Sequence, residues 1–306
     1  MTGELPPFGI FDVSSWPRDQ EEQMGSKRKV WLEEPGRQAL HLFKYVRKDR
    51  TGRRYGDDWA EKIAAELAPL MGVPVAEVEL ASRADGPGTI SRRMNDPDVV
   101  ELVHGNELLA RSATRYEKDI KREHPLYTVP AVAVALEDAR GARAGELASF
   151  SAFEVWAGYL VFDAWIANTD RHHENWGVLR RRTTAGDRLA PSFDHGSSLG
   201  FNVAADDLSA YRAHPDGVER WCRRGRSGHF AGRPCLVDVA VEALAAVRPA
   251  VRKHWLESLD AVTEDRWHRT IARVPDERMS EDARTFVGKV LEINRRRVLD
   301  ERRAAS

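Results

Sequence analysis

Short apolar runs separated by turn residues mark the first third of the chain. Two such runs, at residues 30–32 and 40–43, lie on either side of the turn sequence Glu-Pro-Gly at 34–36. This arrangement is typical of a β-hairpin. Similar runs at 75–80 and 88–90 predict two further strands.

A helix is predicted between the two pairs of strands. Asp57 and Asp58 have side chains suited to an N-cap, and Gly72 is suited to a helix stop. Apolar side chains recur at helical spacing between them, at residues 59, 63, 67 and 70. We expect Pro69 to distort the last turn. The predicted order is strand, strand, helix, strand, strand.

From about residue 96 the pattern becomes helical. Helices are predicted over four segments, at residues 99–109, 150–166, 237–246 and 282–302. The second of these is apolar on nearly every side, which marks a helix enclosed by other helices. Tryptophans 156, 165 and 176 are expected to fill the core around it. Residues 220–233 are rich in Gly and Arg and are expected to form an exposed loop.

Charge and composition narrow the function classes. The 306 residues include 47 basic and 48 acidic side chains, a net charge of -1, so direct binding of nucleic acid is not expected. No run approaches the roughly 18 apolar residues of a membrane span, and no export signal is seen at the start. The two cysteines, Cys222 and Cys235, are too few for a disulfide framework. We expect a cytoplasmic protein without a membrane segment.

The stretch from residue 168 to 196 holds the most informative chemistry. Strand-like runs at 178–182 and 188–193 flank a turn at 184–187, which predicts a hairpin. The residue before the first strand and the residue after the second lie at the same end of an antiparallel hairpin. Asn175 and Asp194 are therefore expected to meet. An amide oxygen and a carboxylate together form a site suited to Mg²⁺.

Asp170 lies in the loop that follows the buried helix, five residues before Asn175. The spacing Asp-x-x-x-x-Asn, followed by Asp-x-Gly after the hairpin, is the one that protein kinases use for a catalytic base and two metal ligands. Asp170 is the predicted base, with Asn175 and Asp194 as metal ligands. His172 is expected to brace this loop through hydrogen bonds.

Phosphoryl transfer also needs positive charge on the phosphates. Lys44 ends the second predicted strand, and Glu61 lies in the first turn of the following helix. A strand lysine held by a helix glutamate orients the ammonium group toward the α and β phosphates in kinases. Glu66 is a competing acid on the same helix. The two glutamates are five positions apart and face different directions, so we expect only one to face the cleft.

A glycine-containing basic stretch precedes the first strand of the N-terminal hairpin. Its backbone N–H groups and side chains are expected to contact phosphates. It is not a Walker sequence, because Gly-x-x-x-x-Gly-Lys is absent. The predicted nucleotide-binding residues of this stretch are Gly25, Ser26, Lys27 and Lys29.

The catalytic segment, Asn168-Thr-Asp-Arg-His with Asn175 and then Pro-Ser-Phe-Asp at 191–194, resembles the signature of HipA-like kinases. These form a branch of the protein-kinase-like fold that also resembles phosphatidylinositol 3/4-kinases. The resemblance extends to the basic stretch, to Lys44 and to the helix around Glu61, and covers roughly residues 20 to 200.

The resemblance implies an α+β, two-lobed protein-kinase-like fold. Residues 1–95 would form a small β-rich N-lobe and residues 96–306 a larger helical C-lobe, with ATP and Mg²⁺ in the cleft. The implied activity is transfer of the γ-phosphoryl group of ATP to Ser or Thr of a protein substrate. Asp170 is then the base, Asn175 and Asp194 bind metal, and Lys44 contacts phosphate.

Two departures from HipA toxins affect regulation and partners. HipA toxins have a further N-terminal subdomain, for which the residues before the basic stretch leave no room. Their regulatory serine upstream of that stretch is replaced here by Glu21, Glu22 and Gln23. Autophosphorylation at that place is therefore not expected, and an antitoxin-like partner stays an open question.

Two other function classes stay open beside this hypothesis. The same fold accommodates a lipid or small-molecule kinase, and a nucleotide-binding regulator without catalysis is a third class. A zinc or hydrolase site built on His172, His173 and His195 is disfavoured because adjacent histidines point apart and a regularly spaced third ligand is absent. Cys222, His229 and Cys235 match no common zinc spacing, so structural cysteines are expected.

Overall fold

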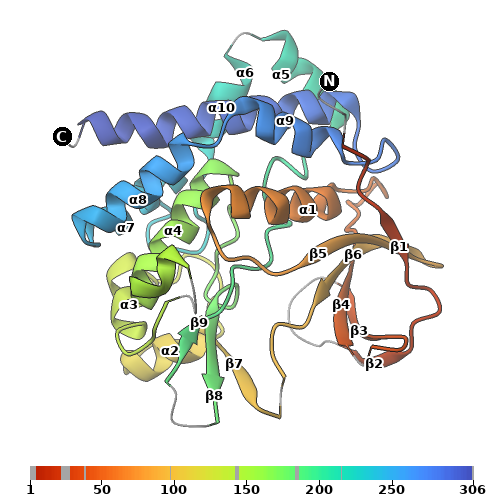
Figure 1. Cartoon of the computed structure of the whole chain (residues 1–306). Helices are drawn as coiled ribbons and strands as arrows, with labels where there is room; N and C mark the ends of the chain where they lie inside the picture. The colour runs from red at the N-terminus through yellow and green to blue at the C-terminus, as the bar shows by residue number, and fades with distance from the viewer. Residues whose placement is uncertain are drawn as a thin grey trace.

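The computed structural model describes residues 5–21, 28–37, 39–96, 98–141, 145–182, 186–214 and 216–304, and each structural statement below concerns these residues. A mixed six-stranded sheet lies beside a larger group of helices (Figure 1). The strand order is β1-β5-β6-β4-β3-β2. The strands span Ile10–Asp12 (β1), Arg18–Glu21 (β2), Lys29–Glu34 (β3), Ala39–Tyr45 (β4), Val78–Arg83 (β5) and Gly86–Arg92 (β6).

The predicted N-terminal hairpin is confirmed by the antiparallel pairing of β3 with β4. Lys29 lies directly opposite Lys44 in this pair. Directly opposed residues point to the same face of a sheet, so the two lysine side chains lie together. Strands β5 and β6 also match the predicted runs, whereas β1 and β2 were not predicted.

The two faces of the sheet meet different surroundings. Leu80 belongs to the large core that also contains Phe8, the apolar residues of α1 and the helices of the second half of the chain. Its neighbour Ala81 belongs to a smaller cluster with Leu32 and Phe43. Successive strand residues point to opposite faces, which explains this division.

Helix α1 (Asp57–Leu67) covers the sheet on the side of the large core (Figure 1). Gly56 is its N-cap, with Asp57 and Asp58 in the first turn. Pro69 lies in the short 3₁₀ helix η1 (Ala68–Met71), which ends at Gly72 with a φ of 74°. The predicted distortion and stop are therefore confirmed.

A second sheet of three strands, in the order β7-β8-β9, corrects the prediction for residues 99–109. These strands span Val100–His104, Gly177–Arg181 and Arg188–Leu189. The helix α2 (Gly105–Ser112) begins only after β7. Leu102 pairs with Leu179, more than seventy positions further along the chain. Pairing with this distant strand makes residues 100–104 a strand, and the local pattern of apolar residues does not reveal that partner.

Helix α4 (Ala152–Trp165) forms the centre of the helical part, and every one of its residues is buried. A capping box between Ser151 and Glu154 starts it. Tryptophans 156, 165 and 176 are at most 1% exposed, which confirms their predicted place in the core. The other helices span Val129–Ala135 (α3), Glu146–Ser149 (η2, a 3₁₀ helix), Ala205–Ala213 (α5), Gly217–Arg224 (α6), Leu236–Ala245 (α7), Pro249–Asp260 (α8), Glu264–Ala272 (α9) and Glu281–Ala304 (α10).

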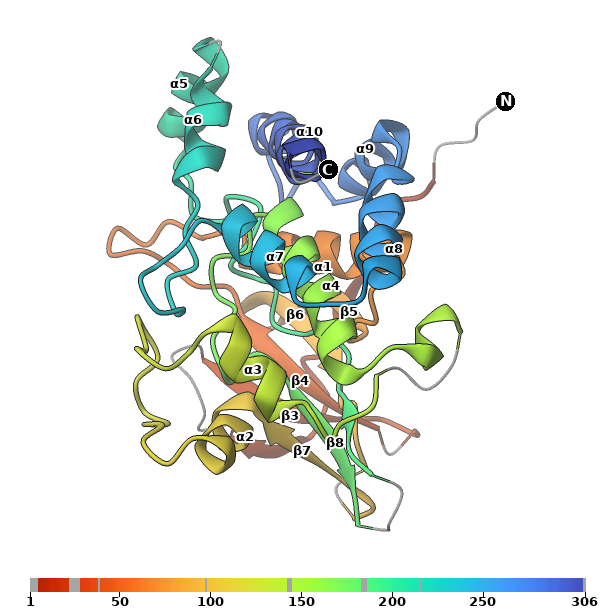
Figure 2. The ribbon, with the colours of Figure 1, turned by 90° about the vertical axis from the view of Figure 1, so that its left-hand side faces the viewer.

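Residues 220–224 belong to α6, so the exposed loop predicted for residues 220–233 is wrong in its first part. Trp221 lies against Phe286 of α10, with ring centroids 5.1 Å apart, and Cys222 is buried beside it. This apolar stripe makes the segment helical despite its arginines. Figure 2 shows α5 and α6 projecting from the rest of the molecule. In the described ranges both cysteines are free, and no helix is long and apolar enough to cross a membrane.

Candidate active site

Lys44 and Glu61 form the ion pair that the sequence predicts. The Lys44 ammonium donates to Oε1 of Glu61 at 2.9 Å and to Oδ1 of Asp194 at 3.0 Å, and its side chain is 11% exposed. Burial by itself lowers the pKa of Lys44, but the carboxylates of Asp194 and Glu61 outweigh it and raise the pKa above its usual value. The lysine is therefore charged at neutral pH.

The competing acid, Glu66, belongs to a different set of contacts. It accepts a hydrogen bond from Lys62 at 2.7 Å and lies near Arg273. Glu61, in contrast, is 3% exposed beneath the sheet. The expectation that only one of the two glutamates faces Lys44 agrees with these contacts.

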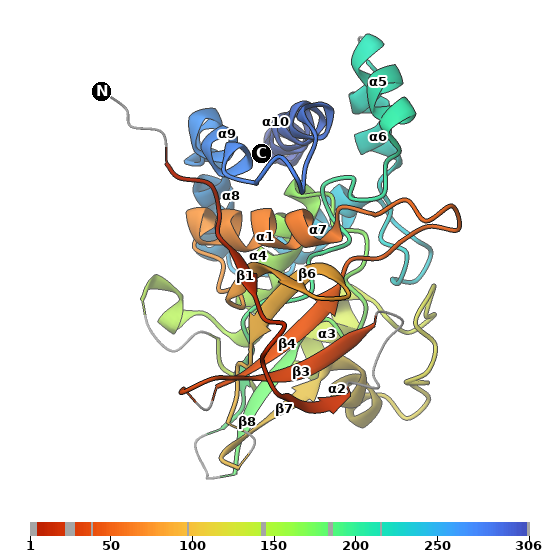
Figure 3. The same cartoon turned by 90° about the vertical axis from the view of Figure 1, so that its right-hand side faces the viewer.

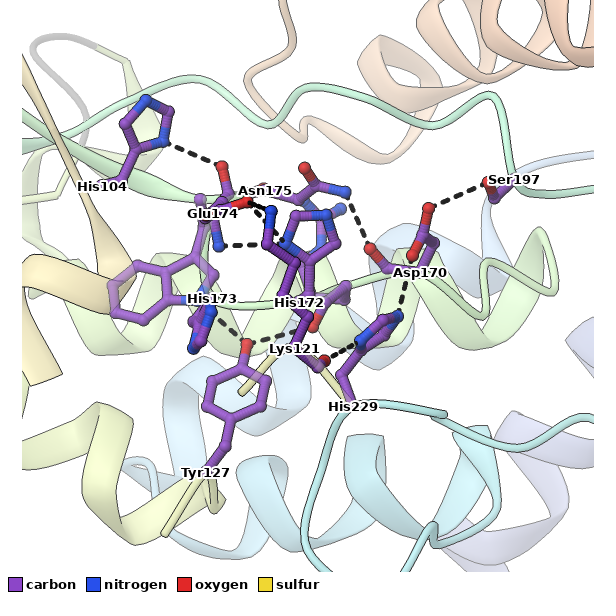
Figure 4. Close-up of polar contacts among 12 residues, drawn as sticks. His104, Lys121, Tyr127, Asp170, His172, His173, Glu174, Asn175, Ser197 and His229 are labelled. Atoms are coloured by element: carbon purple, nitrogen blue, oxygen red, sulfur yellow. Dashed lines mark hydrogen bonds and ion pairs between the residues drawn. The ribbon is translucent and has the colours of Figure 1, made fainter. Parts of the chain in front are cut away.

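Asp170 is held from two sides by residues distant in sequence (Figure 4). Its Oδ1 lies 2.8 Å from Nε2 of His229, and its Oδ2 accepts a hydrogen bond from the Ser197 hydroxyl at 3.0 Å. Burial raises the pKa of the Asp170 carboxyl, but the hydrogen bond from His229 helps to offset this and the net pKa is lowered. The carboxylate is ionised at neutral pH, and its side chain is 28% exposed.

The sequence analysis considered His229 only as a zinc ligand and did not predict its contact with Asp170. The Nδ1 of His229 contacts the backbone carbonyl of Lys121. Its other nitrogen faces the Asp170 carboxylate. The imidazole is thus fixed at both nitrogens. Fifty-nine positions separate it from Asp170, and no local motif in the sequence connects the two.

His172 braces its own loop, as predicted. Its Nδ1 accepts a hydrogen bond from the backbone N–H of Glu174 at 3.2 Å. Burial lowers the pKa of His172 to about 4, so the ring is neutral at neutral pH and its proton lies on Nε2. His173 points elsewhere and contacts the Tyr116 hydroxyl at 2.6 Å. In the described part of the chain no three His, Cys, Asp or Glu side chains form a cluster that could hold a metal ion.

Asn175 and Asp194, the predicted metal ligands, line the same cavity. The Asn175 amide nitrogen donates to the backbone carbonyl of Asp170 at 2.8 Å, which leaves the amide oxygen for a ligand. Asp194 has a φ of 58°, a conformation that turns the chain sharply after the hairpin. The glycine at position 196 leaves room for α1, because a Cβ there would lie 3.0 Å from the carbonyl oxygen of Asp57. The Asp-x-Gly sequence therefore lets this segment approach α1 closely.

The cavity has a volume of about 440 Å³ and lies between the main sheet, β7 and the loop of residues 166–176 that follows α4. Lys29 and Lys44 line it from the sheet, and Asn175 and Asp194 line it from the other side. This volume is in the usual range for a small-molecule site. Of the four predicted nucleotide-binding residues in the basic stretch, Lys29 is described, whereas Gly25, Ser26 and Lys27 lie outside the described residues.

Arg171 organises the loop from within, and the sequence analysis did not single it out. Its guanidinium binds Asp163 of α4 in a bidentate pair, with distances of 2.7 and 2.8 Å. It also donates to the Asn175 carbonyl at 2.6 Å and to the Ser192 hydroxyl at 2.9 Å. The two charged side chains are 2% and 3% exposed. Arg171 thereby connects α4, the loop of residues 166–176 and the segment before Asp194.

A family model described as the HipA-like C-terminal domain matches residues 23–259 of this chain. The chain belongs to this family. The matched range contains five predicted site residues of this chain: Lys44, Glu61, Asp170, Asn175 and Asp194. No curated protein matches its sequence.

Two solved structures show the same fold. The proinflammatory kinase CtkA of Helicobacter pylori has 18% identity and a TM-score of 0.74, over 95% of this HipA-like chain and 96% of CtkA. HipA of Shewanella oneidensis MR-1, solved with HipB and its operator DNA, has 14% identity and a TM-score of 0.57, over 95% and 69% of the two chains. The mixed sheet-and-helix part of the predicted fold is therefore confirmed. The boundary between lobes at residues 95 and 96 stays a prediction.

Proposed function

We propose that the protein is an ATP- and Mg²⁺-dependent phosphotransferase that transfers the γ-phosphoryl group to a Ser or Thr hydroxyl of a protein. The observation that carries this proposal is the Lys44 ammonium, 2.9 Å from Glu61 and 3.0 Å from Asp194 on the wall of a cavity that Asn175 also lines. Membership of the HipA-like family and the fold shared with a kinase support it.

The donor set fits Mg²⁺. One carboxylate, from Asp194, and one amide oxygen, from Asn175, are hard oxygen ligands, and Mg²⁺ prefers few of these together with phosphate oxygens and water. When bound, the ion neutralises charge on the β and γ phosphates. Lys44 and Lys29, opposed on one sheet face, bring two further positive charges to the same cavity.

Asp170 acts on the acceptor. Its carboxylate is ionised and partly exposed, so it can orient an acceptor hydroxyl and take its proton at Oδ1 or Oδ2. Ser197 now donates to Oδ2, in the manner that an acceptor hydroxyl would. Positioning and charge neutralisation then supply most of the rate acceleration.

Incubation of the protein with labelled ATP, Mg²⁺ and a lysate of the source cell tests the proposal. Transfer of label to a protein supports it. ATP binding in calorimetry without transfer to any protein supports a nucleotide-binding regulator instead, and label in a lipid or small molecule supports the other acceptor class.

Asp194→Ala is expected to remove most of the gain in ATP affinity that Mg²⁺ provides, about tenfold or more, because half of the protein's donor set is lost. Calorimetry with ATP in Mg²⁺ and in EDTA measures this gain. Asp187→Ala is the matched control, since Asp187 pairs with Arg180 on the hairpin surface. An unchanged Mg²⁺ effect in Asp194→Ala would contradict the assignment of the ligand.

His229→Ala is expected to lower the transfer rate about a hundredfold with little change in ATP affinity, because the Asp170 carboxylate loses its orientation. His229→Gln should recover part of the rate, since its amide N–H can donate to Asp170. Steady-state kinetics separates kcat from the KM for ATP. His268→Ala, on the surface of α9, is the control. Equal rates for His229→Ala and His229→Gln would exclude this positioning role.

The proposal extends to the cellular location of the protein and to a protein partner. The two free cysteines support a cytoplasmic location. An antitoxin-like partner is proposed only by likeness to the Shewanella HipA, which was solved with HipB. Fractionation of the source cell tests the location, and copurification with the tagged protein tests the partner.

A further inference from the structure

The hydrogen-bond partners of Asp170 connect it to three loops. His172 and Asn175 line the nucleotide cavity, but Asp170 is not among its lining residues. The loops are residues 46–56, 113–128 and 225–235, named here the basic loop, the middle loop and the His229 loop.

Hydrogen bonds tie each loop to the surroundings of Asp170. Arg47 of the basic loop donates to the Ser197 hydroxyl at 3.3 Å, and Ser197 in turn donates to Asp170. The middle loop supplies the Lys121 carbonyl that holds His229. It also pairs with the His229 loop through the N–H of His124, 3.1 Å from the His229 carbonyl. Figures 2 and 3 show the three loops projecting on one side of the molecule.

The basic loop has a strong excess of positive charge. It contains five basic residues and one acid, Asp49, which Arg53 already binds at 2.9 Å. Lys48, Arg50 and Arg54 are exposed, and no ion pair joins them to a described residue. Arg224, at the end of α6 just before the His229 loop, is likewise exposed without an ion pair among the described residues.

Exposed cations elsewhere in the chain are often paired. Lys289 binds Glu292 at 2.7 Å, Arg269 binds Asp265 at 2.7 Å and Lys253 lies 3.8 Å from Glu257. The whole chain has a net charge of only -1. The three exposed cations of the basic loop, unpaired among the described residues, belong to the same loop as Arg47, which reaches Asp170 through Ser197. They create a positive potential on this face of the molecule.

We propose that this face binds an acidic segment of the acceptor protein, so that the phosphorylated Ser or Thr is flanked by Asp or Glu. The inference rests on the proposed function, because it names the substrate class of the same site. A protein segment is favoured over a nucleic acid, because the middle loop interleaves its exposed acids, Glu117, Asp119 and Glu123, with exposed cations and so offers no continuous positive surface to a run of phosphates. A short acidic segment meets the basic loop without crossing these acids.

Binding of short peptides tests the inference without requiring transfer. Three fluorescein-labelled peptides of equal length have a central serine flanked by Asp and Glu, by Asn and Gln, or by Lys and Arg. Fluorescence anisotropy at low and physiological salt should show tightest binding of the acidic peptide, with affinity falling as salt rises. Equal binding of all three peptides would overturn the inference, and so would tighter binding of a single-stranded oligonucleotide of the same charge.

The triple variant Lys48→Glu, Arg50→Glu and Arg54→Glu should lower affinity for the acidic peptide about tenfold or more, because each exposed ion pair contributes a factor of roughly two to five. A matched control reverses three remote cations, Lys253, Arg266 and Lys289, and so makes the same change in net charge. It should bind like the native protein. Equal losses in the two triple variants would show only a net-charge effect and would contradict the proposed face.

Asp170→Asn separates this inference from the proposed function. The variant should bind the acidic peptide as tightly as the native protein while failing to phosphorylate it. If the native protein binds the acidic peptide selectively but transfers no phosphate to any acceptor, the kinase proposal fails and the docking face stands. If transfer occurs without preference for acidic flanks, the docking face fails and the kinase proposal stands.

Discussion

Asp170→Asn is expected to lower phosphoryl transfer about a thousandfold, while the affinity for ATP with Mg²⁺ stays within a factor of about two. The amide cannot take up the acceptor proton at neutral pH. It has nearly the shape of the carboxylate, and its oxygen can still accept a hydrogen bond from His229 or from Ser197. The fold and the nucleotide cavity should therefore persist, since Asp170 does not line that cavity.

Transfer kinetics and calorimetry on the same preparation measure the two effects. Asp187→Asn, which makes the same chemical change on the hairpin surface, should transfer phosphate at the native rate. The pH profile gives an additional check. Because the pKa of Asp170 is lowered, the base is ionised throughout the neutral range, and activity should fall only in acid as pH drops through that pKa. A rate for Asp170→Asn within tenfold of native would refute its role as base.

The second large effect concerns stability. Arg171→Met is expected to lower the free energy of unfolding by about 3–5 kcal/mol, because it leaves the Asp163 carboxylate buried without its partner. The Asn175 carbonyl and the Ser192 hydroxyl lose donors at the same time. Urea unfolding followed by circular dichroism measures the loss.

Arg180→Met provides the matched control. Arg180 binds Asp187 at 2.6 Å with similar geometry, but the two side chains are 31% and 25% exposed. A surface pair of this kind contributes about 1 kcal/mol or less. The double variant Asp163→Leu with Arg171→Met should recover part of the loss, since no unpaired charge is then buried. Losses of equal size for Arg171→Met and Arg180→Met would contradict the structural role assigned to Arg171.

Contacts between residues that lie close together along the chain were predictable from the sequence. Asp170 and Asn175 lie in one loop, and the hairpin between Asn175 and Asp194 is defined by its own turn. Lys44 and Glu61 lie on consecutive elements, β4 and α1. In each case the chain between the residues is short enough for strand, turn and helix patterns to predict where they meet.

Other features were not predictable because their partners are distant. Strand β7 exists because β8 pairs with it, although its apolar residues also fit a helical pattern. His229 gained its role from the Asp170 carboxylate and the Lys121 carbonyl, which three separate segments bring together. The segment of α6 is helical because Trp221 and Cys222 pack in the apolar core, where Trp221 contacts Phe286 of α10.

The sequence by itself determined the kinds of chemistry available: a strand lysine, a helix glutamate, and an aspartate, asparagine and aspartate at the spacing of a phosphotransferase. Only the tertiary structure decided which groups hold Asp170, that Arg171 is buried against Asp163, and that the basic loop connects to Asp170 through Ser197. The physical reason is that hydrogen bonds and charge interactions act over a few ångströms in space. Sequence patterns describe neighbours along the chain, whereas these contacts join segments that become neighbours only on folding.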